Sequence, residues 1–271
     1  MFRHCMRAVR KAALLVVTVF TLAASPVGAQ GETEVDLALV IAVDISYSMD
    51  PEEQALQREG FVGAFRSRDV HDAIRSGALG RIAVVYGEWA ATFEQRIIVP
   101  WMVIDDPESA MAFADRLAAQ PTRRGPRTSV SGAIDFGVRL LAESGVTTAR
   151  RVIDISGDGA NNQGRPVTPA RDEAVAQGIT INGLPIMLNR PSSYWDVTEL
   201  DVYYKDCVIG GPGAFIHPVR NAREFPQAIR TKIIREIADR PLPQPLIRFA
   251  QGDSPLSSCM AGELRRERWG N

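Results

Sequence analysis

The chain has 271 residues, in which 31 basic residues nearly balance 32 acidic residues, and its formal net charge is −1. This balance, without a block of Lys or Arg, argues against nucleic acid as the main partner. The length suits one large α/β domain or two small domains.

The first 29 residues have the three-part layout of a secretory signal. Four basic residues precede an uncharged apolar run at residues 12–24, and Val27-Gly28-Ala29 offers the small residues that a signal peptidase recognises. The run is shorter than the roughly 20 residues of a spanning helix, and an uncleaved membrane anchor is the alternative. We expect cleavage after Ala29, a periplasmic or secreted protein without a membrane span, and a mature chain with 27 basic and 32 acidic residues.

The stretch from Val35 to Asp50 is the most informative part of the chain. Its unbroken apolar run ends at Asp44 and predicts a strand that is buried on both faces of a parallel sheet. Ser46 and Ser48 follow at alternate positions. Ligands bind at the carboxyl ends of strands in open α/β sheets, and hard divalent cations prefer oxygen ligands. These three side chains therefore predict part of a metal site.

The remaining elements alternate between strands and helices. We expect helices over residues 51–65, 106–120, 128–143, 168–177 and 225–238, with a short helix within 194–207. We expect strands over residues 81–89, 93–100, 151–156, 179–187 and 214–217, of which the first two form an antiparallel hairpin. This pattern predicts a doubly wound, mostly parallel six-stranded sheet with one antiparallel edge strand and helices on both faces. The α/β domain covers residues 30–240, and residues 241–271 are expected to form a poorly ordered tail.

Two further oxygen-bearing positions lie where such a sheet can bring them to Asp44. Thr128 lies in a loop that runs into a helix, and Asp158 lies between glycines at a strand end. Each has a simpler explanation. Asp44 and Ser46 are compatible with a helix cap and turn, Thr128 with a helix cap, and Asp158 with a turn. The occurrence of all these residues in this order favours the metal site over the separate explanations.

Three segments resemble the metal-ion-dependent adhesion site (MIDAS) of von Willebrand factor A (VWA) domains: Asp44-x-Ser46-x-Ser48, then Thr128 followed by Ala133, then Asp158-Gly159. The resemblance extends over residues 34–238. Within that superfamily, the stretches SGDGANN and YYKDCVIGGPGAF are similar to bacterial secreted proteins of the DUF1194 family.

The resemblance implies a role for each residue. Ser46 and Ser48 would bind the metal directly, Thr128 would bind it directly or through water, and Asp44 and Asp158 would hold coordinating waters. The ion expected is Mg²⁺, with Mn²⁺ or Ca²⁺ as substitutes. Adhesion domains leave one metal position for an acidic side chain of a partner. The resemblance therefore implies an exported, non-enzymatic module that binds a protein partner through a donated Asp or Glu.

Two other functions stay open from the sequence. Asp44, Asp158 and a metal are compatible with a hydrolase, although no general base is evident. A scaffold that binds no ion is the other alternative. Nearby arginines, including Arg124 and Arg127, either repel a cation or attract an acidic partner, and we favour attraction.

A few residues remain outside this site. Asp154 lies within a strand as a paired structural acid or as support for the site, and the sequence favours the first. Asn161 and Asn162 make a turn or line the rim of the site. Cys207 and Cys259 are the two mature cysteines, and they form a disulfide or stay free in an oxidising compartment.

Overall fold

The computed structural model describes residues 32–188, 199–238, 259–260 and 262–264. The predicted export signal over residues 1–29 and most of the predicted tail lie outside these residues. No helix in the described part of the chain is long and apolar enough to cross a membrane.

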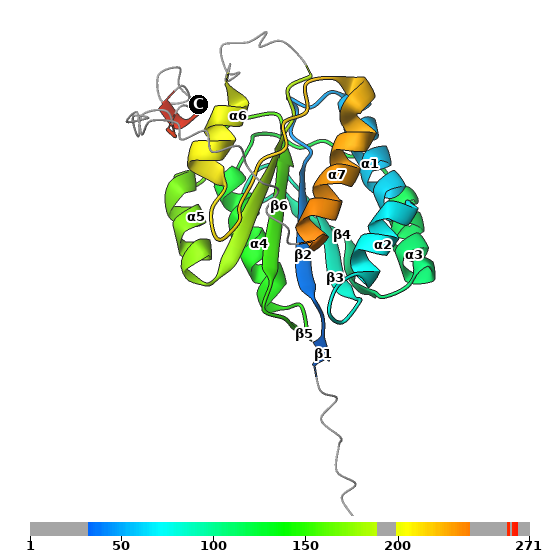
Figure 1. Ribbon diagram of the computed structural model, residues 1–271. Coiled ribbons are helices and arrows are strands. Elements are labelled where there is room, and N and C mark those ends of the chain that lie inside the picture. Colours follow the sequence, from blue (N-terminus) through cyan, green and yellow to red (C-terminus); the bar gives the residue numbers. More distant parts are fainter. Residues whose placement is uncertain (1–31, 189–198, 239–258, 261, 265–271) are drawn as a thin grey trace, which may run out of the picture. The chain divides into compact units, whose positions relative to one another are not determined.

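The predicted buried strand is the central strand of a five-stranded sheet (Figure 1). It is β2 (Leu37–Asp44), and it pairs in parallel with β3 (Ile82–Trp89) and β6 (Arg151–Gly157). β7 (Ile179–Pro185) extends the sheet in parallel beyond β6, and β4 (Gln95–Ile104) forms the antiparallel edge beside β3. The predicted mostly parallel sheet with one antiparallel edge strand is therefore confirmed.

The prediction of a sixth strand at residues 214–217 is wrong, because the sheet has five strands among the residues that the structure describes. This segment runs beside β7 and touches it through isolated bridges, such as Gly183 with Ile216, instead of a continuous ladder. Gly211 and Gly213 take positive φ angles just before the segment. The Phe215 amide donates to the side chain of Asn182, and such side-chain bonds replace regular strand pairing. A separate two-stranded sheet joins β1 (Thr33–Glu34) to β5 (Val146–Thr147).

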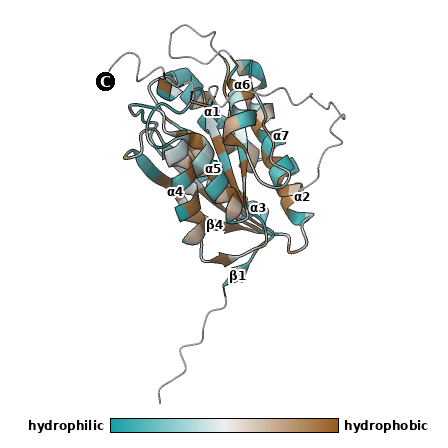
Figure 2. Cartoon of the chain, turned by 90° about the vertical axis from the view of Figure 1, so that its left-hand side faces the viewer, coloured by the Kyte–Doolittle hydropathy of each residue, from teal (hydrophilic) through white to brown (hydrophobic). Residues whose placement is uncertain are grey.

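Helices cover both faces of the sheet, because the side chains of β2 alternate between two apolar clusters. One cluster includes Leu39 and Ile41 and packs against α1 (Pro51–Phe65), α2 (Arg68–Arg75), α3 (Pro107–Ala118) and α7 (Phe225–Ala238). The other includes Ala38 and Val40 and packs against α4 (Val130–Ala142), α5 (Val167–Ala176) and α6 (Leu200–Tyr203). Figure 2 shows hydrophilic and hydrophobic stretches side by side on these helices, as expected for amphipathic elements.

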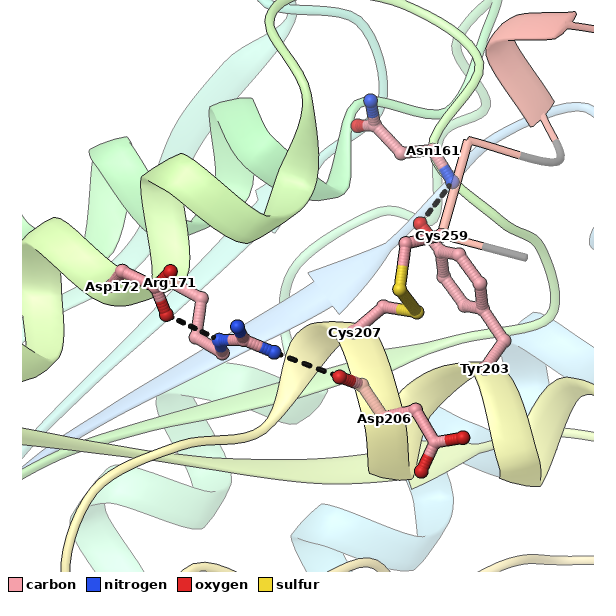
Figure 3. The surroundings of a disulfide bond; sticks show 7 residues. All are labelled: Asn161, Arg171, Asp172, Tyr203, Asp206, Cys207 and Cys259. Atoms are coloured by element: carbon pink, nitrogen blue, oxygen red, sulfur yellow. Dashed lines mark hydrogen bonds and ion pairs between the residues drawn. A yellow bond between two sulfur atoms is a disulfide. The ribbon is translucent and has the colours of Figure 1, made fainter. Parts of the chain in front are cut away.

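Cys207 and Cys259 form a disulfide with a Cα–Cα distance of 5.4 Å (Figure 3). Cys207 lies in a π-helical turn, Tyr204–Val208, directly after α6. The short helix expected within residues 194–207 is represented by α6 and this turn, and residues 194–198 lie outside the described residues. The bond joins residues 259, 260 and 262–264, called here the C-terminal segment, to the domain.

Candidate functional site

Asp44 is the last residue of β2, and its side chain is fully buried. Its Oδ1 accepts a hydrogen bond of 2.7 Å from the Ser46 amide, which fixes the turn that follows the strand. Ser46 in turn forms a bridge with Gly125, in the loop before α4. The end of the central strand is thereby joined to a loop almost eighty residues further along the chain.

Two serines connect this turn to the next strand end. The Ser46 and Ser48 hydroxyls are 2.8 Å apart, and the Ser48 hydroxyl donates to Asp158 Oδ1 at 2.7 Å. Asp158 directly follows β6, which pairs with β2 along its length. Parallel pairing brings the carboxyl ends of these two strands together, and the side chains of Ser46, Ser48 and Asp158 therefore lie close to one another.

Thr128 comes from a third loop. The N-cap of α4 is Ser129, whose hydroxyl accepts from the Gly132 amide at 3.1 Å, so Thr128 is not the helix cap. The Thr128 amide donates to Asn162 Oδ1 at 2.9 Å, and the Asn162 amide donates to the Thr128 carbonyl at 2.9 Å. These two hydrogen bonds hold Thr128 beside the loop that carries Asp158.

The three loops enclose one cavity of about 250 Å³. Four of the five residues of the predicted metal site line it, namely Ser46, Ser48, Thr128 and Asp158. Its other lining residues are Tyr47, Arg127, Gly159, Ala160, Asn162 and Gly262. The fifth predicted residue, Asp44, is buried behind the lining and contacts Ser46.

The surroundings of Asp44 are electrostatically unusual. Its Oδ2 is buried and has no hydrogen-bond partner among the described residues. Burial raises the pKa of Asp44 well above its usual range, the charge of Asp158 raises it further, and the bonds from Ser46 lower it. A Cβ at Gly157 would lie 2.8 Å from Oδ2, so a side chain there would displace the carboxylate.

The donor set fits a hard cation. It consists of hydroxyl and carboxylate oxygens, the ligand type that Mg²⁺ and Ca²⁺ prefer, and the buried carboxylate has an oxygen without a hydrogen bond. Groups of three or more His, Cys, Asp or Glu side chains placed for a metal are absent from the described residues.

Basic and aromatic side chains surround the opening. Arg127 lines the cavity and is the one non-glycine residue with positive φ in the described chain, at 66°. Tyr47 is 61% exposed, and the Arg124 guanidinium lies 5.5 Å from the centre of its ring. Arg124 also donates to the Tyr47 carbonyl at 2.5 Å. Sequence reasoning did not identify Tyr47, because an exposed tyrosine between two serines carries no local signal.

Other sequence expectations are resolved by burial and bonding. Asp50 is the N-cap of α1, so neither Asp44 nor Ser46 caps that helix. Asp154 is buried and lies 2.5 Å from the Lys232 amine, which confirms the interpretation of a paired structural acid. Asn161 accepts a hydrogen bond from Ser131 in the first turn of α4, Asn162 accepts one from Thr128 in the loop before it, and Asn162 lines the cavity. Gly262 also lines the cavity, although it is distant in sequence from every predicted ligand.

Comparisons with known proteins identify the family and the fold. Residues 34–241 match the profile of a family described as protein of unknown function (DUF1194). No curated protein matches the sequence. Solved structures with a similar fold include a von Willebrand factor type A protein from Catenulispora acidiphila, with 16% identity, a TM-score of 0.53, and 75% of this chain and 43% of that chain covered.

Two adhesive or matrix proteins have the same fold. Proximal thread matrix protein 1 from the mussel byssus has 15% identity and a TM-score of 0.53, with 76% of this chain and 48% of that chain covered. The pilus adhesin SpaC from Lactobacillus rhamnosus GG has 11% identity and a TM-score of 0.57, with 77% of this chain and 32% of that chain covered. The chain spans less than half of each structure, and the likeness establishes a VWA fold.

Proposed function

Since the chain belongs to the DUF1194 family and has a VWA fold, we propose that it is an exported module that binds an acidic group on a protein partner through a divalent cation. The signal-like layout of residues 1–29 supports export. One observation carries the binding role: oxygen-bearing side chains from three separate loops line a single cavity, namely Ser46, Ser48, Thr128 and Asp158.

In this proposal the Ser46, Ser48 and Thr128 hydroxyls hold the ion, and the Asp44 and Asp158 carboxylates offset its charge. We expect Mg²⁺, with Mn²⁺ or Ca²⁺ as substitutes. The bound ion would supply a positive charge and a coordination position for a carboxylate oxygen. The hydrogen bond from Ser46 orients Asp44, and the paired bonds between Thr128 and Asn162 hold the third loop in place.

The rim of the cavity suits an acidic ligand. Arg127 lines it, and Arg124 is held beside it by Tyr47. Positive side chains near an opening attract a carboxylate and raise its rate of association. Among the described residues that line the cavity, Asp158 is the single carboxylate, and it already accepts a hydrogen bond from Ser48. This arrangement supports binding in preference to a hydrolase that needs a general base.

Calorimetry with Mg²⁺ tests the cation site. We expect Ser46→Ala and Asp158→Asn each to weaken Mg²⁺ binding by about tenfold or more, because the first removes a hydroxyl ligand and the second removes a negative charge that offsets the ion. The matched control is Asp135→Asn on α4, whose carboxylate pairs with Arg165 at 2.7 Å and does not line the cavity. Unchanged Mg²⁺ affinity in both site variants would contradict the proposal.

A pair of peptides tests the acidic ligand. One peptide carries a single Glu between glycines, and the other has Gln at that position. We expect the Glu peptide to bind in Mg²⁺ and to be released by a chelator, while the Gln peptide binds at least about tenfold more weakly. Equal binding of both peptides would exclude carboxylate recognition, and binding that resists the chelator would favour a metal-independent scaffold.

A further inference from the structure

The C-terminal segment lies directly beside the candidate site. Its anchor is the disulfide between Cys259 and Cys207, which are separated by 52 residues in sequence (Figure 3). Cys207 is fully buried in the π-helical turn after α6. Cys259 is partly buried and packs against the apolar cluster that contains Cys207, so the bond fastens the C-terminal segment to the core of the domain.

The segment is also bonded to the loop that carries Asp158. Asn161 Nδ2 donates to Glu263 Oε1 at 2.7 Å. The Asn161 amide donates to the Tyr203 hydroxyl at 3.1 Å, four residues before the anchoring cysteine (Figure 3). Asn161 therefore connects the Asp158 loop both to the C-terminal segment and to the element that holds the disulfide.

Gly262 makes the closest approach. A Cβ built on this residue would lie 2.0 Å from the Asn161 carbonyl oxygen, so the segment can occupy this position only with glycine. Gly262 is at the same time one of the residues that line the cavity with Ser46, Ser48 and Thr128. The C-terminal segment is thus one wall of the candidate site.

We propose that this tethered wall limits the size of the group that enters the site, an inference that rests on the proposed function. The cavity of about 250 Å³ is smaller than the roughly 300–1,000 Å³ typical of sites for drug-sized ligands. With the wall in place, the site admits a single carboxylate side chain on a slender backbone. Release of the wall widens the opening, and acidic groups with bulky neighbours then enter.

Two variants of the exported protein release the wall by different routes. Cys207→Ser with Cys259→Ser removes the tether, and Gly262→Ala introduces a methyl group that collides with Asn161 while the disulfide stays intact. The matched control is Gly63→Ala, because a Cβ at Gly63 meets nothing within 4 Å. Two independent methods then report on the position of the wall and on ligand size.

Hydrogen exchange reports on the wall without any metal or ligand. We expect backbone amides of residues 158–163 to exchange about tenfold faster in both wall variants than in the unaltered protein and the control, because the segment no longer covers this loop. Unchanged exchange in both wall variants would overturn the proposal, whatever happens to Mg²⁺ binding.

Peptide affinities measured in the presence of Mg²⁺ report on the size of the group that the site admits. The probes are a peptide with Glu between glycines and one with Glu between tryptophans. The unaltered protein is expected to prefer the glycine-flanked peptide by about tenfold, and the wall variants are expected to bind both equally. An unaltered protein that binds both peptides equally would overturn the wall's role in selection. Absence of Mg²⁺-dependent binding in every protein, with faster exchange in the wall variants, would instead contradict the proposed function.

Discussion

Two fully buried aspartates on neighbouring strands have different roles because their partners differ. Asp154 on β6 lies 2.5 Å from the Lys232 amine, so its charge is compensated within the fold. Asp44 on β2 receives a bond from the Ser46 amide, and burial raises its pKa, as does the charge that acts on it, the negative charge of Asp158. A buried carboxylate without a nearby positive charge destabilises the fold, and a bound cation can supply that charge. This contrast supports Asp44, and not Asp154, as part of the candidate site.

Replacing Lys232 with Met tests the compensated acid. Lys232 contacts both Asp154 and Glu236, so its loss leaves two buried carboxyl groups without a cation and should destabilise the fold by about 3–5 kcal/mol near pH 8. Burial, helped by the charge of Asp154, already raises the pKa of Glu236 from 4.5 to about 7. A raised acid pKa means that the folded state binds the proton more tightly. Stability therefore falls as the pH rises from 4.5 to about 7, and the variant should recover stability at pH 5.

Urea unfolding at pH 5 and pH 8 measures this effect. The control is Arg230→Met on the same helix, because the ion pair of Arg230 with Asp69 is 3.7 Å long and partly exposed. We expect the control to lose little stability at either pH. The same loss in Lys232→Met at both pH values would contradict the account.

A substitution at Arg127 can remove its positive charge while keeping its backbone conformation. Its φ of 66° favours Gly or Asn, so Arg127→Asn keeps the conformation and removes the charge. We expect the free energy of unfolding to change by less than about 0.5 kcal/mol, while the Glu peptide binds more weakly and its affinity depends less on salt. Arg116→Gln, at an exposed position of α3, is the control. Unchanged peptide affinity in Arg127→Asn would contradict attraction by the rim.

At the scale of elements, local signals explain why most helix and strand boundaries agree with the prediction. Apolar runs defined the buried strands, and α1 and α3 each begin with an acidic N-cap, a capping box and proline. The failures also have local causes. The eight-residue helix α2 was not predicted, because it buries only Val70 and Ile74 and so offers a single pair of apolar positions at helical spacing. The segment at residues 214–217 has strand-like composition, but glycines with positive φ precede it.

The two capping boxes provide a matched pair of variants. Asp50 caps α1 directly after the turn that carries Ser48, whereas Asp106 caps α3 away from the cavity. Asp50→Ala should lower stability by about 1 kcal/mol and also weaken Mg²⁺ binding, because the start of α1 positions that turn. Asp106→Ala should lower the melting temperature without changing Mg²⁺ affinity. Equal Mg²⁺ affinities in the two variants would show that the cap of α1 does not support the site.

At the scale of the whole molecule, the site depends on strand order. β2 lies between β3 and β6, and their parallel pairing places the turn after Asp44 beside the loop of Asp158. Backbone bonds of the loop before α4 to Ile45 and Ala90 bring Thr128 to the same edge. The sheet therefore holds three distant segments in one place, as open α/β sheets do at their carboxyl ends.

A cation held by this fold should stabilise the whole domain. Binding to the folded state alone raises stability by mass action, by about 2.7 kcal/mol when the free ion is at 100 times its dissociation constant. We expect Mg²⁺ to raise the melting temperature of the unaltered protein and of Asp135→Asn, and to have little effect on Asp158→Asn. The same melting temperature in Mg²⁺ and in a chelator would argue against a cation site.

The sequence by itself determined the fold class and the types and order of residues at the candidate site, because apolar periodicity, capping residues and the Asp-x-Ser-x-Ser pattern are local signals. Tertiary structure alone decided that Asn162 holds Thr128, that Lys232 pairs with Asp154, and that Gly262 lines the cavity. These facts depend on contacts between residues far apart in the chain. Only the packing of the sheet, the helices and the disulfide brings such residues together.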